Sequence, residues 1–122
     1  VAIAGVDIMV TAYVSDQPVG VEGEDEVELP LTFELKQNYP NPFNPSTVIS
    51  YQLPQNEVVN LEIYNALGQK VRTLVNEAQE AGQYEIIWDG KNNSGNELSS
   101  GVYLYRLTAG NYVKVMKMML VR

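Results

Sequence analysis

The sequence predicts an all-β protein in which about seven short strands form a sandwich of two antiparallel sheets. Two observations predict this fold. Apolar and polar residues alternate with a period of two along most of the chain after residue 35, as they do in half-buried strands. Groups of Gly, Asn, Asp, Ser and Pro interrupt the alternation at short intervals, as turns require, and no helical period is present.

A separate strand is predicted for residues 1–14, ahead of the sandwich. All its even positions are apolar: Ala2, Ala4, Val6, Ile8, Val10, Ala12 and Val14. A lone strand is not stable in water, so another element must cover this face. Three interpretations stay open: the strand ends a preceding domain, it pairs with the domain that follows, or Ala4, Val6, Ile8, Val10, Ala12 and Val14 are donated to a neighbouring copy.

Residues 15–34 are predicted to be an acidic linker. Residues 1–36 carry eight acids and one base, whereas residues 37–122 carry seven of each, so the net charge of −7 belongs to the leading part of the chain. Like charges extend such a segment, and its backbone is accessible to a processing protease. A chain without a basic patch is not expected to bind nucleic acid or an anionic membrane surface.

The domain proper is predicted over residues 35–122. Residues 38–46 are rich in Pro and Asn, which indicates a stiff, non-helical lead into the first domain strand. The strands are predicted at 47–53, 57–65, 70–75, 83–88, 101–109 and 112–121, with polar loops at 76–82 and 89–100. Trp88 and most of the tyrosines are expected between the sheets, with the tyrosine hydroxyls reaching the rim.

The composition argues against catalysis and cofactors. The chain has no His and no Cys, so the commonest general base, the commonest metal ligand and thiolate chemistry are missing. The loop from Asp89 to Gly95 offers oxygen atoms but lacks the spacing of a calcium loop. We therefore expect no enzyme activity, no metal and no cofactor. No apolar run reaches the roughly 18 residues of a membrane span, so no membrane insertion is expected.

Five motifs follow one another in a fixed order: QNYPNPFNPST, LEIYNALGQKVRTLV, AGQYEIIWDG, SSGVYLYRL and KVMKMMLVR. In this order they resemble the type A C-terminal sorting domain of the type IX secretion system, over about residues 35–122. The central motifs are also similar to the immunoglobulin-like domain of flagellar hook-capping proteins. The leading PNPFNPST and the lysine-containing end favour the sorting domain. The resemblance implies an immunoglobulin-like sandwich.

The resemblance also implies a non-catalytic signal. A protein of this family crosses the periplasm, is recognised by an outer-membrane translocon and reaches the cell surface or the medium, where a sortase commonly removes the domain. The residues carried over from the motifs are Asn41, Pro42, Phe43, Gly68, Gly101, Val102, Tyr103 and Lys117. Recognition is best placed on the terminal strand, because a strand edge is a ready-made docking surface.

Two further functions stay open beside the sorting module. The chain would be a small secreted structural subunit if strand 1–14 inserts into the next copy and builds an extracellular filament. It would be a surface or carbohydrate-binding module if the sandwich presents an exposed platform of aromatic side chains.

Overall fold

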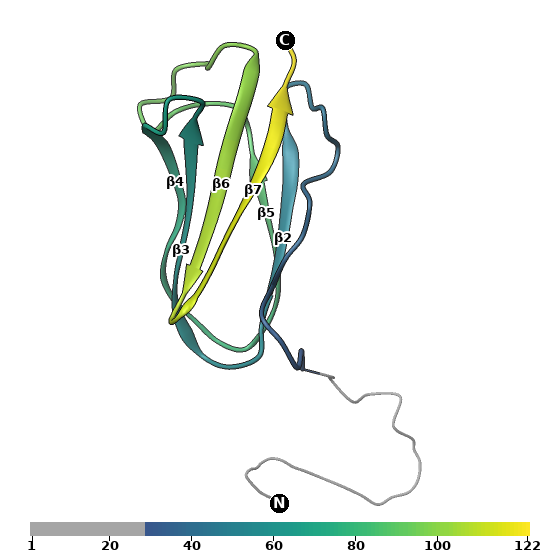
Figure 1. Cartoon of the computed structure of the whole chain (residues 1–122), viewed down its shortest axis with the longest axis vertical. Coiled ribbons are helices and arrows are strands. Elements are labelled where there is room, and N and C mark those ends of the chain that lie inside the picture. Colours follow the sequence, from purple (N-terminus) through teal and green to yellow (C-terminus); the bar gives the residue numbers. More distant parts are fainter. Residues whose placement is uncertain (1–28) are drawn as a thin grey trace, which may run out of the picture.

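The computed structural model describes residues 29–122, which form two antiparallel sheets stacked face to face (Figure 1). Seven strands make up these sheets: β1 (Glu34–Leu35), β2 (Thr47–Leu53), β3 (Glu57–Asn65), β4 (Lys70–Gln79), β5 (Gly82–Trp88), β6 (Gly101–Ala109) and β7 (Tyr112–Leu120). One sheet has the order β1-β2-β5 and the other β4-β3-β6-β7. The predicted seven-stranded immunoglobulin-like sandwich is confirmed. The strand predicted over residues 1–14 lies outside the described residues, as do residues 15–28 of the linker.

The core lies between the sheets because each strand turns alternate side chains inward. In β2 the inward positions are fully buried, and β3 and β6 repeat the pattern. Trp88 closes one end of the core. Its ring lies 5.7 Å from that of Phe43 and 5.6 Å, edge-on, from that of Tyr103. Aromatic rings in such tilted contacts add to the energy of simple burial.

The polar loop predicted over residues 76–82 is wrong for most of its length. Strand β4 continues to Gln79, and Asn76, Glu77 and Ala78 pair in register with β3. The end of this strand lies at the edge of its sheet with Asn76, Glu77 and Ala78 all exposed, so burial does not demand apolar residues there. Period-two alternation is weak in such a strand, and its composition resembles that of a loop.

Most tyrosines of residues 29–122 lie between the sheets as expected, because Tyr84 and Tyr112 pack against the core beside the three buried tyrosines. Within residues 29–122, the buried tyrosines are Tyr51, Tyr103 and Tyr105. Tyr39 is 80% exposed, and the remaining tyrosines of this part are half-buried. The last strand ends at Leu120, one residue earlier than predicted. No helix in residues 29–122 has the length and hydrophobicity of a membrane span.

The proline-rich segment, residues 38–46, connects β1 and β2 of one sheet and contacts the edge of the other sheet on the way. Tyr39 still bridges to Val48 of β2, but four residues later Phe43 pairs in parallel with Leu120 of β7. In Figure 1 the segment runs beside β2 and β7 at one side of the sandwich. All three of its X–Pro peptide bonds are cis. The segment therefore joins the two sheets along the side that carries β7.

Candidate functional site

The strongest candidate site is the junction between the proline-rich segment and the end of β7. The backbone N of Phe43 donates to the carbonyl oxygen of Met119 at 2.9 Å, and the N of Val121 donates to the carbonyl oxygen of Phe43 at 2.9 Å. The N of Met119 donates to Oδ1 of Asn41 at 3.0 Å. Asn41 and Phe43 thus satisfy both backbone groups of Met119 on the outer edge of β7.

A buried hydrogen-bond network holds the proline-rich segment in this position. Asn38, only 2% exposed, donates its backbone N to the hydroxyl of Tyr105 at 2.8 Å and its Nδ2 to Oγ1 of Thr47 at 2.9 Å. The Thr47 hydroxyl donates to the carbonyl oxygen of Pro40 at 2.8 Å, and the Tyr105 hydroxyl donates to that of Lys36 at 2.8 Å. Buried polar groups with satisfied partners fix one conformation.

Burial changes the pKa of the Tyr105 phenol, which belongs to this network. It raises the pKa of Tyr105 to about 12, and the hydrogen bond from the Asn38 backbone offsets only part of the rise. The hydroxyl therefore stays protonated at any physiological pH and keeps both its donor and its acceptor roles. The role of Tyr105 is structural, because its hydroxyl does not ionise at physiological pH.

A small pocket of about 140 Å³ opens where the proline-rich segment meets β7 and β6. Its lining residues are Asn41, Val102, Lys117, Met118 and Met119. Three residues predicted from the sequence, Asn41, Val102 and Lys117, therefore lie together although they come from three separate motifs. The carbonyl oxygen of Lys117 also accepts a 2.8 Å hydrogen bond from the side chain of Gln37. The residues around the pocket are thus an asparagine, a lysine and three apolar residues.

The other predicted residues have roles that the fold itself explains. Phe43 is 1% exposed and belongs to the core. Tyr103 is buried, and its hydroxyl donates to the carbonyl oxygen of Ser99 at 2.7 Å. Gly68, with φ +83°, closes the β3–β4 turn, and Gly101, with φ +154°, begins β6. Such backbone angles favour glycine.

The remaining two residues predicted from the sequence are Pro42 and Gly68. Pro42 is exposed between Asn41 and Phe43. Gly68 is separated from the pocket by β3 and β6, so the structure does not place it in the site.

Sequence reasoning missed the residues that build the anchor, namely Gln37, Asn38, Thr47 and Tyr105. Their partners lie as far as 80 positions away in the chain, so no local spacing connects them. The sequence contained one signal for this anchor. Asn38 lies two residues before the PNPF motif and has a side chain that favours local backbone hydrogen bonds, and it does donate to the carbonyl oxygen of Pro40 at 3.1 Å.

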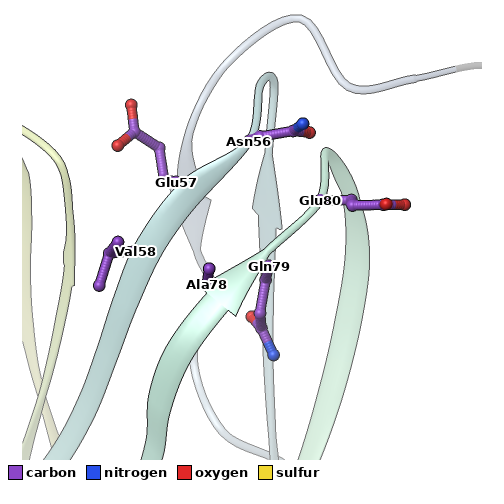
Figure 2. Close-up of a pocket in the computed structure, with 6 residues that line it drawn as sticks. All are labelled: Asn56, Glu57, Val58, Ala78, Gln79 and Glu80. Carbon is purple, nitrogen blue, oxygen red and sulfur yellow. The ribbon is translucent and has the colours of Figure 1, made fainter.

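A second pocket, about 520 Å³, lies elsewhere, at the ends of β3 and β4. Figure 2 shows that its side chains do not converge: Glu57 and Val58 point to one side, whereas Asn56 and Glu80 point to the other. The Glu57 carboxylate accepts a hydrogen bond from Gln55 at 2.7 Å. A binding site needs polar groups aimed at one ligand position, so this opening is a surface hollow.

In the Gly- and Asn-rich loop after β5, side-chain oxygen atoms accept hydrogen bonds from the loop backbone and from Arg72. Asp89 Oδ1 lies 3.1 Å from Nη1 of Arg72 and accepts from the backbone N of Lys91 at 3.1 Å. Asn92 Oδ1 accepts from the backbone N of Ser94 and of Asn96, each at 3.0 Å. Within residues 29–122 no three His, Cys, Asp or Glu side chains gather in an arrangement for a metal ion.

The comparisons with known proteins agree with this architecture. The family model of the FlgD Ig-like domain matches residues 43–112. No curated protein matches the sequence significantly. The structure of dimeric latent PorU from Porphyromonas gingivalis has a TM-score of 0.58 and 24% identity, over 70% of this chain and 9% of that chain.

Two further structures show weaker likeness. PorZ of P. gingivalis, described as an essential bacterial surface component of the type IX secretion system, has a TM-score of 0.47 and 22% identity, over 74% of this chain and 11% of that chain. FlgD of P. aeruginosa has a TM-score of 0.49 and 27% identity, over 61% of this chain and 57% of that chain. The chain thus spans only a small part of PorU and PorZ. Because the family model covers more than half of the sequence, the chain belongs to the family of FlgD Ig-like domains.

Proposed function

We propose that this domain is a non-catalytic C-terminal sorting module, which directs a secreted protein through the type IX secretion system to the cell surface or the medium. The observation that carries the proposal is the hydrogen bond between Asn41 and Met119. It joins the PNPF motif to the terminal strand, and these are the two parts of the sequence that distinguish a sorting domain from a hook-capping domain.

The range of the family match supports the same interpretation. The match begins at Phe43 and ends at Tyr112, so it covers the shared sandwich and leaves out Asn41, Pro42 and most of β7. The unmatched ends meet in the pocket lined by Asn41, Lys117 and Met119. A receptor that reads a folded domain needs its determinants on one surface, and this junction supplies one next to a strand edge.

The partners of the proposed function are the outer-membrane translocon and a sortase. The translocon would contact the junction, and the sortase would cut in the linker over residues 15–34, where acidic residues are dense. A carbohydrate-binding function receives less support. In the described part of the chain, Tyr39 is the one fully exposed aromatic side chain, and a sugar platform needs several side by side.

A secretion assay tests the proposal. A reporter protein is fused ahead of the full chain and produced in a bacterium with a type IX system and in a strain that lacks its translocon. We expect the reporter outside the first strain and in the periplasm of the second. A reporter that stays in the periplasm of both strains, or leaves both, would contradict the sorting function.

A pair of variants tests the site. Lys117→Ser changes the pocket, whereas Lys114→Ser changes an exposed lysine of the same strand outside the pocket. We expect Lys117→Ser to reduce export and Lys114→Ser to leave it near the wild-type level. Both proteins should unfold at the wild-type temperature, because exposed surface substitutions change stability by less than about 0.5 kcal/mol. Equal export of the two variants would place recognition elsewhere.

A further inference from the structure

Strand β7 lies at the edge of its sheet, and the proline-rich segment covers only its C-terminal half. Asn41 and Phe43 bind the outward backbone groups of Met119, and Gln37 binds the outward carbonyl oxygen of Lys117. Residues of a strand point their N–H and C=O groups alternately to either side. Because Lys117 and Met119 point away from β6, Val113 and Val115 do so as well.

The N-terminal half of the β7 edge, from Val113 up to the hydrogen bond between Gln37 and the Lys117 carbonyl oxygen, is therefore open. Among residues 29–122, no backbone hydrogen bond reaches the outward groups of Val113 and Val115. Their side chains are 57% and 49% exposed. An open strand edge flanked by apolar side chains is a template for another strand, and native proteins generally cover such edges.

The core-facing side of the same edge is also incompletely covered. The rings of Phe33 and Tyr112 stack at 5.1 Å, and with Met116 they are half-buried against the main core. These three side chains are partly buried apolar groups on the core-facing side of this edge, where exposed Lys114 lies between Tyr112 and Met116. A strand added to this edge would need one apolar face to cover these apolar groups.

Residues 1–14 have the required pattern, because every even position from Ala2 to Val14 is apolar. Their tether ends in the right place, since Phe33 stacks on Tyr112 at the N-terminal end of β7. A flexible chain of about 18 residues, the length of segment 15–32, spans about 21–25 Å on average. The open edge from Val113 to Lys117 is about 14 Å long, so the strand is within reach.

Charge favours the same path for the tether. Residues 22–28 contain five acids. Lys114 and Lys117 are exposed on β7, and neither forms a salt bridge with another residue in the described part of the chain. A segment rich in acids is attracted to a strand that carries exposed lysines.

We propose that residues 1–14 of the same chain pair with the open edge of β7 as an additional strand, with the even-numbered face over Phe33, Tyr112 and Met116. The strand comes from the same chain because the open edge is short. A ladder of this length gains too little free energy to offset the translational and rotational entropy that two separate molecules lose on association. A short tether supplies an effective concentration in the millimolar range instead. This pairing goes beyond the proposed sorting function and does not depend on it.

Amide hydrogen exchange, followed by nuclear magnetic resonance, tests the pairing. The amides of Val113 and Val115 are compared between the full chain and a chain that begins at Ser15. We expect exchange at one or both to be slower by at least about tenfold in the full chain, because pairing protects an amide from water. The amides of Lys114 and Met116 face β6 and serve as internal controls. Equal exchange in the two chains would overturn the proposal.

Two variants and a concentration series complete the test. Ile8→Asp places a charge in the apolar face and should restore fast exchange, whereas Thr11→Asp changes the opposite face and should keep the protection. The protection should be the same at micromolar and submillimolar concentrations, with a monomeric mass by light scattering. Protection that appears only at the higher concentration, together with a larger mass, would assign the strand to a second copy and overturn pairing within the chain.

Discussion

Asn41 and Met119, which lie 78 positions apart, are joined by a 3.0 Å hydrogen bond from the Met119 backbone to the Asn41 side chain. This contact makes the proline-rich segment an additional, parallel partner of β7. It also divides the β7 edge into a covered half and an open half. The covered half carries the proposed recognition pocket, and the open half is the proposed position of the N-terminal strand.

Removing the Asn41 side chain should weaken the domain slightly. Asn41→Ala should lower the free energy of unfolding by about 0.5–1.5 kcal/mol, since one hydrogen bond is lost at an exposed site where water replaces it. Urea unfolding measures the change. Asn44→Ala is the matched control in the same segment, because no hydrogen bond of its side chain to another residue in 29–122 is present. A larger loss for Asn44→Ala than for Asn41→Ala would contradict the role of the Met119 contact.

Phe43 should be far more important for folding than its neighbours. It is 1% exposed and packs on Trp88, so Phe43→Ala should destabilise the domain by about 3–5 kcal/mol. Thermal or urea unfolding measures the loss, and Phe43→Leu should recover part of it. Tyr39→Ala removes an 80% exposed ring from the same segment and is expected to change stability by less than about 0.5 kcal/mol. Similar losses for the two alanine variants would mean that the segment is not anchored through Phe43.

Alkaline pH should destabilise the domain through two buried phenols. Burial raises the pKa of Tyr51 and of Tyr105 to about 12, although hydrogen bonds with Gln79 and Asn38 act in the opposite direction. The unfolded chain ionises near pH 10, so this contribution is complete below pH 10 and declines as the pH rises towards 12. Each phenol should remove about 1.4 kcal/mol per pH unit in that window.

Urea unfolding between pH 9 and pH 12 tests this prediction. Tyr105→Phe should lower stability at neutral pH, because the Asn38 backbone N loses its buried acceptor, and should flatten the alkaline decline. An unchanged slope in both Tyr105→Phe and Tyr51→Phe would show that these phenols are not the titrating groups.

Acid should weaken a charge cluster on the outer face of β3 and β6. Glu62 accepts a hydrogen bond from the Tyr64 hydroxyl at 2.7 Å and lies 2.9 Å from Nη2 of Arg106. The Tyr64 hydrogen bond is the main cause that holds the pKa of Glu62 below its usual value, with help from Arg106 and Lys70 against the effect of burial. This contribution is present above the unfolded pKa and is lost as the pH falls through the folded pKa.

Glu62→Gln removes the titrating group, so its stability should fall less steeply between neutral pH and pH 3 than that of the wild type. Tyr64→Phe keeps the carboxylate but removes its strongest hydrogen bond, and should also flatten the acid branch. Both are measured as the free energy of unfolding against pH. An acid branch as steep as the wild type in both variants would exclude Glu62 as its source.

The sequence by itself determined the strands whose alternation is strong. Strands β2, β3 and β6 begin and end where the pattern predicts, because one face of each is buried and the other is not. Glycines such as Gly68 marked turns for a local steric reason. In each case the information lies within a few neighbouring residues, and single-sequence reasoning can reach it.

Only the tertiary structure decided where β4 ends, which tyrosines are buried and how the predicted site residues meet. Strand β4 is polar to Gln79 and gains its order from pairing with β3. Asn41, Val102 and Lys117 lie in separate motifs and meet because the segment between β1 and β2 contacts the edge of β7 at Phe43. These features depend on contacts between residues far apart in the chain, which leave no period in the sequence. Their positions follow from how the two sheets close around Trp88 and not from any local preference.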